Sequence, residues 1–366
     1  KPLIIRGARQ VGKTWIMKTF GQQYFEKTAY VNFDNNARMK QVFEGDLDIE
    51  RLVLSISAET GVSIEAENTL IIFDEVQEVP KALTSLKYFY ENAPQYAIVA
   101  AGSLLGVALH QGTSFPVGKV DFLDLYPLNF REFLCAMGEK QFVSMLDSCD
   151  TQMVTVFKTK YIERLREYYF VGGMPEVVKD FSEKKDYNRV RAIQKNLINY
   201  YQQDFSKHAE IKLVPRLNLV WNSIPMQLAK ENKKYIYGQV REGSRAKDFE
   251  LAIQWLLDCG LIHKVQRIQK PDLPLKAYID FDAFKLFLVD IGLLIAMTDL
   301  DAKVIIEGNK IFTEFKGSLT EQYILQQLIS DVGVIPYYYS TQNSKGEIDF
   351  LVQGKTSVIP IEVKAE

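Results

Sequence analysis

The sequence has 366 residues, which is too many for one ordinary hydrophobic core, so we expect two to four domains. Its residues are 47% hydrophobic and 25% charged, and its formal net charge of -2 excludes a strongly basic chain that would coat nucleic acid. A local basic groove is still compatible with this charge. The three cysteines and three histidines lack paired or metal-ligand spacing, which argues against disulfides and zinc and favours the reducing cytoplasm.

No apolar stretch of the sequence is long enough to span a membrane, so we expect no membrane partner. The longest apolar run, "LFLVDIGLLIAM" at residues 286–297, contains Asp290 and predicts a buried helix. The first residue is Lys1, and a strand pattern follows at once. We therefore expect that an N-terminal segment is missing and that the last domain is truncated at its C-terminus.

Residues 2–20, "PLIIRGARQVGKTWIMKTF", predict a strand, a glycine-rich loop and a helix in that order. The loop from Gly7 to Thr14 matches G-x-x-x-x-G-K-[ST], a pattern that binds nucleotide phosphates. Backbone N–H groups and the helix N-terminus form the anion site, Lys13 is expected to reach the β- and γ-phosphates, and Thr14 is expected to bind Mg²⁺. The residues expected to contact ATP are Gly7, Ala8, Arg9, Gln10, Val11, Gly12, Lys13, Thr14 and Trp15.

A second motif, "TLIIFDEVQ" at residues 69–77, predicts a strand buried on both faces that ends in Asp74 and Glu75. Ligands bind at the carboxyl ends of the strands in open α/β sheets. Asp74 is placed to hold the Mg²⁺ shell through water, and Glu75 to polarise the water that attacks in phosphoryl transfer. The same acids could also cap the next helix, which Pro80 predicts to begin, and both interpretations can hold together.

Two further strands complete the pattern of the first 135 residues. "YAIVAAGS" at residues 96–103 ends in Ser103, which either reaches the γ-phosphate or the attacking water, or caps the following helix. "TAYVNFDNN" adds another strand. Five apolar strands that alternate with helices predict a doubly wound α/β fold for residues 1–135, with Lys13, Glu75 and Ser103 as its catalytic residues.

The motifs "GARQVGKT", "IIFDEVQ", "AAGS" and "LYPLNFREFL" together resemble the AAA-type P-loop ATPase module of a prokaryotic family whose C-terminal part is poorly characterised. The resemblance implies ATP hydrolysis with Mg²⁺, a winged helix, and a restriction-endonuclease-like domain of the PD-(D/E)xK type. It also implies a homo-oligomer, since AAA-type modules often assemble into rings.

An arginine finger is harder to assign from the resemblance. The family often has Gly-Arg where this sequence has Gly118-Lys119, and a lysine cannot make the planar, bidentate contact of an arginine. Arg131 is another candidate. A surface-helix position without such a role is the interpretation that we favour for Arg131.

Residues 136–210 show a helical pattern and are predicted to form a linker or lid region. The pattern breaks at Gly172-Gly173, and Pro175 follows, so one helix stops and another begins. In the resembling family this break is a recurrent hinge-like feature. A tight turn between two helices is the alternative.

Residues 211–300 predict a winged-helix-like domain. The segment from Phe249 to Leu257 follows the helix period, and "LIHKVQRI" and "LKAYIDF" are the expected strands of the wing. Acidic residues lie close to Arg245 and Lys247, whereas a groove-reading helix is usually more positive. DNA binding and a structural or protein–protein role therefore remain alternatives.

The last segment, residues 301–366, predicts a small restriction-endonuclease-like domain made of a helix, a strand and a hairpin. In the hairpin "GEIDFLVQGKTSVIPIEVKAE", facing positions are expected to sum to about 710, which places Asp349 opposite residue 361 or 362. Glu362 and Lys364 alternate with apolar residues and are expected on one face. Pro360 predicts an edge strand or a bulge.

Two carboxylates on neighbouring strands and a lysine could support metal-dependent phosphodiester hydrolysis, with Mg²⁺ or Mn²⁺ as a second metal and DNA or RNA as substrate. The predicted nuclease residues are Glu321, Asp349, Glu362 and Lys364, where Glu321 matches the first-helix acid of the resembling fold. A half-buried strand with a solvated charged face is the alternative.

Three functions follow from these patterns. The first is an ATPase coupled to a nuclease or a nucleic-acid module. The second is an ATP-driven switch whose C-terminal domain is catalytically inactive and binds partners or DNA. The third, a small-molecule kinase, is disfavoured by the extra helical and winged segments and by Glu75, which is suited to activating water.

Overall fold

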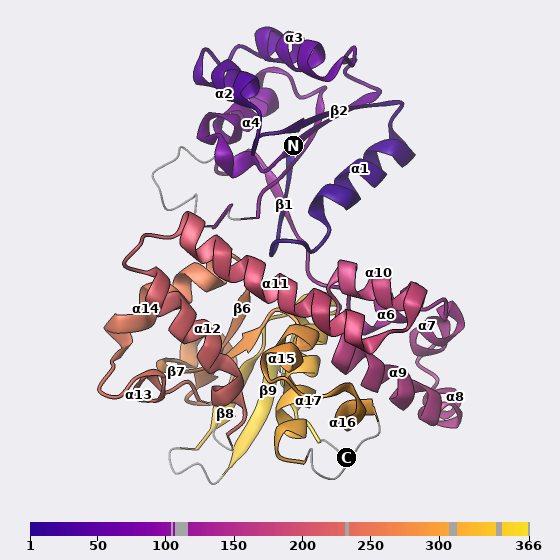
Figure 1. Cartoon of the computed structure of the whole chain (residues 1–366), viewed down its shortest axis with the longest axis vertical. Helices are drawn as coiled ribbons and strands as arrows, with labels where there is room; N and C mark the ends of the chain where they lie inside the picture. The colour runs from indigo at the N-terminus through magenta and orange to yellow at the C-terminus, as the bar shows by residue number, and fades with distance from the viewer. Residues whose placement is uncertain (104, 107–115, 231–233, 307–312, 342–345, 365–366) are drawn as a thin grey trace. The chain divides into compact units, whose positions relative to one another are not determined.

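Two units make up the chain in the computed structural model, Lys1–Leu125 (unit 1) and Tyr126–Glu366 (unit 2) (Figure 1). The structure describes all residues except 104, 107–115, 231–233, 307–312, 342–345 and 365–366.

Unit 1 is built on a sheet of five parallel strands in the order β2-β3-β4-β1-β5. Helices α2, α3 and α4 pack on one face of the sheet and α1 packs on the other (Figure 1). The elements are β1 (Leu3–Arg6), α1 (Lys13–Tyr24), β2 (Lys27–Asn32), α2 (Ala37–Glu44), α3 (Ile49–Thr60), β3 (Thr69–Asp74), the 3₁₀ turn η1 (Val76–Glu78), α4 (Pro80–Asn92), β4 (Ala97–Ala101) and β5 (Asp121–Asp124). The predicted α/β fold with a parallel sheet is confirmed.

The strand order of unit 1 places three loops side by side at the carboxyl ends of the strands. All strands run parallel, so their carboxyl ends lie together, and β4 lies between β1 and β3. The loop that follows β1 therefore lies beside the ends of β4 and β3. These loops carry the phosphate-binding motif, Ser103, and the pair Asp74 and Glu75.

Unit 2 begins with helices, as the pattern of residues 136–210 predicts. They are followed by further helices and by the strands of a second sheet. The elements are α6 (Phe130–Ala136), α7 (Lys140–Asp147), α8 (Thr151–Val156), α9 (Lys158–Val171), α10 (Pro175–Lys184), α11 (Tyr187–His208), α12 (Val214–Leu228), α13 (Tyr237–Val240), α14 (Ala246–Asp258), β6 (Ile262–Ile268), the 3₁₀ turn η2 (Leu275–Tyr278), β7 (Ile279–Leu288), α15 (Ile291–Met297), α16 (Ala302–Ile306), α17 (Thr313–Ser330), β8 (Tyr337–Ser340), β9 (Glu347–Gln353) and β10 (Val358–Ile361).

The second sheet joins two segments that the sequence predicts as separate domains. Its strand order is β10-β9-β8-β6-β7, so strands from residues 211–300 and from residues 301–366 belong to one sheet. The expected wing strands β6 and β7 do pair antiparallel, but β6 also pairs with β8 on its other side. They are therefore part of a larger sheet rather than a free two-stranded wing, and the winged-helix assignment stays a prediction.

The prediction of one helix over residues 286–297 is wrong. Strand β7 ends at Leu288 and helix α15 begins at Ile291. Asp290 lies between them and caps α15, because its carboxylate accepts the backbone N–H of Leu293 at 3.0 Å. Apart from Asp290 the run is apolar, because both elements are buried.

The turn at Gly172-Gly173 is held by buried polar contacts within unit 2. Helix α9 ends at Val171 and α10 begins at Pro175, as predicted. The N–H of Gly173 donates to the buried carboxylate of Asp290 at 2.6 Å, and its carbonyl accepts the N–H of Leu128 at 2.7 Å. These contacts are those of a tight turn packed against its neighbours.

Asp290 makes the stability of unit 2 depend on pH. Burial raises the pKa of its carboxyl to about 6, although the backbone N–H groups of Gly173 and Leu293 oppose the shift. The native state therefore holds the proton more tightly than the unfolded state, so the stability due to Asp290 is full below about pH 4 and is lost as pH rises to about 6.

We expect the stability of the wild type relative to Asp290→Asn to fall by about 3 kcal/mol between pH 4 and pH 7. Urea unfolding of both proteins at several pH values measures this difference. Asp301→Asn, at an exposed acid, is the matched control and should give no such slope. A constant difference between wild type and Asp290→Asn across this range would contradict the prediction.

Candidate functional site

The loop between β1 and α1 has the backbone geometry of a phosphate-binding loop. Gly7, Gln10 and Gly12 all have positive φ, at 144°, 65° and 97°. A Cβ at Gly7 would lie 2.1 Å from the carbonyl oxygen of Leu125, so the loop can approach β5 only because this residue is glycine. Gly12 precedes α1 in the left-handed region, which aims the loop and the helix N-terminus at the same space.

Lys13 is buried within this loop, with 7% of its surface exposed. Its Nζ donates to the carbonyl oxygens of Gly7 at 2.9 Å and Ala8 at 2.7 Å. Burial lowers the pKa of Lys13 to about 8, although the charges of Glu75 and Asp74 act in the opposite direction. The ammonium is thus held at the concave side of the loop, where an anionic phosphate would replace carbonyl oxygens as its acceptor.

Asp74 joins the loop to the end of β3. The hydroxyl of Thr14 donates to its Oδ2 at 2.6 Å, and the hydroxyl of Tyr30 donates to the same oxygen at 2.9 Å. The N–H of Glu75 donates to Oδ1 at 3.1 Å. A hydroxyl and a carboxylate in contact are the hard oxygen donors that Mg²⁺ prefers, so Thr14 and Asp74 fit this ion.

Tyr30 has no assigned role in the sequence, since no motif marks it. Burial and the charge of Asp74 raise the pKa of its phenol, so it stays a hydrogen-bond donor to Asp74. The only signal available in advance is its place on β2, two residues before that strand ends beside Asp74.

Glu75 is oriented by two donors. Its Oε2 accepts the side-chain amide of Gln77 at 2.7 Å and the hydroxyl of Ser103 at 2.9 Å. Glu75 itself has φ of 50°, in the left-handed region, which turns the chain into η1 and brings Gln77 back beside it. A Cβ at Gly102 would lie 2.4 Å from Oε1 of Gln77, so a glycine before Ser103 leaves room for this amide.

The remaining loop residues differ in exposure. Ala8 and Val11 are buried and anchor the loop to the core of unit 1. Trp15, which the sequence places at the nucleotide, is 70% exposed. Arg9 and Gln10 lie in the loop itself, and the charge of Arg9 acts on Lys13.

The residues at the two positions considered for an arginine finger have partners inside their own units. Lys119 pairs with Glu91 at 3.0 Å in unit 1. Arg131 pairs with Asp147 and, at 3.9 Å, with Asp331 in unit 2. These ion pairs agree with the surface position that we favour for Arg131.

The hairpin of the predicted nuclease site has nearly the expected register. Ile361 faces Phe350 and Val358 faces Gln353, so facing positions sum to 711 and Asp349 would face Glu362. However, β10 ends at Ile361, so Glu362 and Lys364 lie beyond the strand instead of alternating along it. Strand β10 is an edge strand, as Pro360 predicts.

Each predicted nuclease residue contacts another group of unit 2. Asp349 accepts the backbone N–H of Val363 at 2.8 Å. Lys364 pairs with Glu362 at 2.6 Å, and both side chains are largely exposed.

Glu321 lies within α17. It is buried and lies 3.5 Å from Nζ of Lys285, a residue of β7 to which the sequence assigns no role. Among the residues that the structure describes, no group of three or more histidines, cysteines, aspartates or glutamates is arranged to hold a metal ion.

Sequence families cover most of the chain in three segments. Residues 1–134 match the AAA domain family. This match confirms the prediction of an AAA-type P-loop module at the N-terminus and supports ATP binding by unit 1. Residues 162–304 and 316–366 match two domains of unknown function, DUF8612 and DUF4143. No curated protein matches the chain.

Solved structures show only distant likeness. They include the Walker-type ATPase of Pyrococcus abyssi (14% identity over 81% of this chain and 91% of that chain, TM-score 0.48). Two others are the Drosophila ORC bound to DNA (12%, 81% and 89%, TM-score 0.27) and Cdc6p from Pyrobaculum aerophilum (10%, 84% and 88%, TM-score 0.25). At these scores the likeness supports no inference about this chain.

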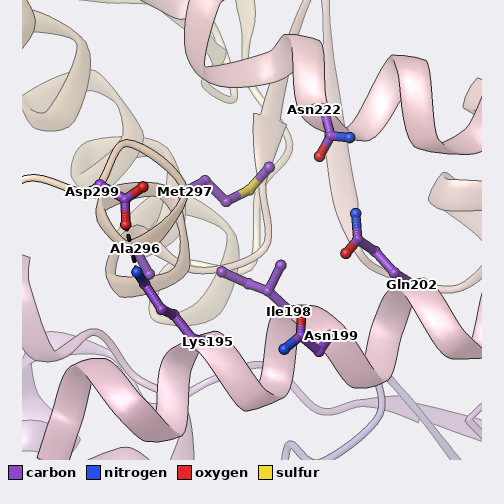
Figure 2. A pocket seen from close by; sticks show the side chains of 8 residues that line it. All are labelled: Lys195, Ile198, Asn199, Gln202, Asn222, Ala296, Met297 and Asp299. Atoms are coloured by element: carbon purple, nitrogen blue, oxygen red, sulfur yellow. Dashed lines mark ion pairs between the residues drawn. The ribbon is translucent and has the colours of Figure 1, made fainter.

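A separate polar pocket of about 330 Å³ lies in unit 2 (Figure 2). Figure 2 shows the amides of Asn199, Gln202 and Asn222 around it, and the ion pair between Lys195 and Asp299 at its edge. The pocket is lined from α11, α12 and the region of α15.

No helix in the described part of the chain is long and apolar enough to cross a membrane.

Proposed function

We propose that unit 1 binds ATP and hydrolyses it with Mg²⁺. The observation that carries this proposal is the orientation of Glu75 by Gln77 and Ser103. Glu75 lies at the carboxyl ends of the same strands as Lys13 and the contact between Thr14 and Asp74. A carboxylate fixed there is what hydrolysis needs in addition to binding. The AAA domain match supports the same conclusion.

The roles of the residues follow from their contacts. Lys13 and the loop N–H groups neutralise and orient the phosphates, and Gly7 and Gly12 give the loop its shape. Thr14 and Asp74 would hold Mg²⁺, which when bound supplies positive charge that stabilises the transferred phosphoryl group. Glu75 accepts a proton from the attacking water, and Gln77 and Ser103 fix its direction.

Replacing Glu75 with glutamine tests the hydrolysis step. We expect Glu75→Gln to lower kcat for ATP about 100-fold, because the amide cannot accept the proton, and to leave ATP binding intact. Steady-state hydrolysis and a nucleotide-binding titration measure the two quantities. Glu78→Gln, at an acid of the same η1 turn that pairs with Lys40, is the matched control. Full turnover in Glu75→Gln would refute the proposed role.

For unit 2 we propose a catalytically inactive platform that binds DNA, RNA or a protein partner, so that the whole chain works as an ATP-driven cytoplasmic switch. Each predicted metal ligand contacts a group of unit 2 itself. Asp349 accepts the Val363 N–H, and Glu362 pairs with Lys364. Assembly of several copies, as AAA-type modules often do, belongs to the same proposal.

A metal-dependent nuclease is the second candidate for unit 2. The hairpin register favours it, because it brings Asp349 beside the segment that carries Glu362 and Lys364. Incubation of the full chain with DNA or RNA, Mn²⁺ and ATP separates the two candidates. Cutting that disappears in Asp349→Ala and in Glu362→Ala decides for the nuclease, and ATP hydrolysis without cutting decides for the platform.

A further inference from the structure

A buried lysine lies among the acids of unit 2. The side chain of Lys285, in β7, is 1% exposed, and its Nζ lies 2.5 Å from Glu347 of β9 and 3.5 Å from Glu321 of α17. The Glu321 side chain is 5% exposed and that of Glu347 is 32% exposed, so Glu347 forms the outer side of the cluster. Strands β7 and β9 and helix α17, which are distant in sequence, thus bring one ammonium and two carboxylates together.

The surroundings of Lys285 favour its charged form. Its Nζ lies within ion-pair distance of two carboxylates, those of Glu347 and Glu321. The ring of Tyr338 also faces the ammonium, with its centroid 4.8 Å from Nζ. The ammonium therefore lies between two carboxylates and an aromatic ring in the folded unit.

The burial of Lys285 excludes a direct part in chemistry on a nucleic acid. A lysine that assists phosphodiester cleavage must reach the substrate or its attacking water, and a side chain with 1% exposure does neither. What remains is its charge at the centre of an acidic cluster. A divalent ion bound by Glu321 and Glu347 would lie close to the ammonium and be strongly repelled by it.

We propose that the ammonium of Lys285 occupies the cation position of this cluster, so that Glu321 and Glu347 hold an internal cation and bind no metal ion. The proposal deepens the proposed function of unit 2 as a platform that does not cut nucleic acid, and it rests on that function. The cluster then stabilises the sheet against α17, and Glu321 is a structural acid.

The test is to remove the ammonium and supply Mn²⁺. We expect Lys285→Met to melt at a lower temperature than wild type, because it leaves buried acids without their cation. Addition of Mn²⁺ should raise the Tm of this variant by about 5 °C, since the ion binds the folded state only. Lys285→Arg is the matched control, which keeps the charge, and its Tm should not respond to Mn²⁺.

The second arm uses the wild-type chain. In the absence of ATP, the affinity of the chain for Mn²⁺ should be the same in wild type and in Glu321→Gln. This comparison decides the question even if Lys285→Met fails to fold. The proposal is overturned if wild type binds Mn²⁺ in a way that Glu321→Gln weakens tenfold, or if folded Lys285→Met gains no response to Mn²⁺. If wild type cuts nucleic acid but its Mn²⁺ titration is unchanged by Glu321→Gln, only the platform function is refuted.

Discussion

Replacing Lys13 with alanine is expected to lower ATP hydrolysis about 1000-fold, the largest kinetic effect of any single change in unit 1. Lys13 is 7% exposed and its Nζ lies at the inner side of the loop, 2.9 Å from the Gly7 carbonyl oxygen. No other lysine of the loop can replace it there, because α1 carries its next lysine, Lys18, on the exposed surface. The positive charge aimed at the phosphates is then lost.

The pH dependence of binding separates this role from a structural one. Burial lowers the pKa of Lys13 to about 8, so wild type should bind ATP more weakly as pH rises through 8 and the ammonium loses its proton. In Lys13→Ala the remaining affinity should lack this dependence. Equilibrium titration with ATP between pH 6.5 and 9.5 measures both, and Lys81→Ala, at an exposed lysine of α4, is the control. Equal turnover in Lys13→Ala and wild type would remove the basis for the ATPase function.

The parts of the proposed ATP site can be found in the sequence because they are local. Gly7 to Thr14 is one continuous loop, and Asp74 with Glu75 directly ends a strand, so spacing alone identifies them. Tyr30 and Gln77 have no predicted role although they contact these acids, because Tyr30 lies outside the quoted motifs and the motif "IIFDEVQ" assigns chemistry only to its acids. Their roles come from strand pairing and from a left-handed turn at Glu75.

Unit 2 is harder to predict because its contacts are long-range. Alternation and turn residues predict β6, β7, β9 and β10 individually, but nothing local shows that they share one sheet. The same holds for Lys285, which lies in an apolar strand and meets Glu321 and Glu347 only after folding. Hairpin register, by contrast, follows from the turn, and the sequence predicts it to within one position.

Replacing Gly173 with alanine is expected to lower the free energy of unfolding of unit 2 by about 4 kcal/mol. This is the largest stability effect that we expect from a glycine-to-alanine change. A Cβ at this position would lie 2.1 Å from the carbonyl oxygen of Leu128 and 2.9 Å from its backbone nitrogen. Backbone atoms cannot turn aside as a side-chain end can, so the turn must separate from residue 128.

That separation would break three hydrogen bonds of unit 2. The N–H of Leu128 donates to Gly173 at 2.7 Å, the hydroxyl of Tyr168 donates to the Leu128 carbonyl at 2.6 Å, and the Gly173 N–H donates to Asp290 at 2.6 Å. Each lost partner leaves a polar group without a hydrogen bond inside the unit. The sum explains why one methyl group is expected to cost so much.

Urea unfolding followed by tryptophan fluorescence measures this effect in the full chain. A Trp15→Phe background leaves Trp221 and Trp255, both buried in unit 2, as the reporters, so the transition of unit 1 does not enter. Gly317→Ala is the matched control, because no atom of the described residues lies within 4 Å of a Cβ at this position and alanine favours a helix, so stability should hold or rise by about 0.5 to 1 kcal/mol. If Gly173→Ala unfolds at the same urea concentration as wild type, the turn is free to yield, and a hinge at this position becomes the better interpretation.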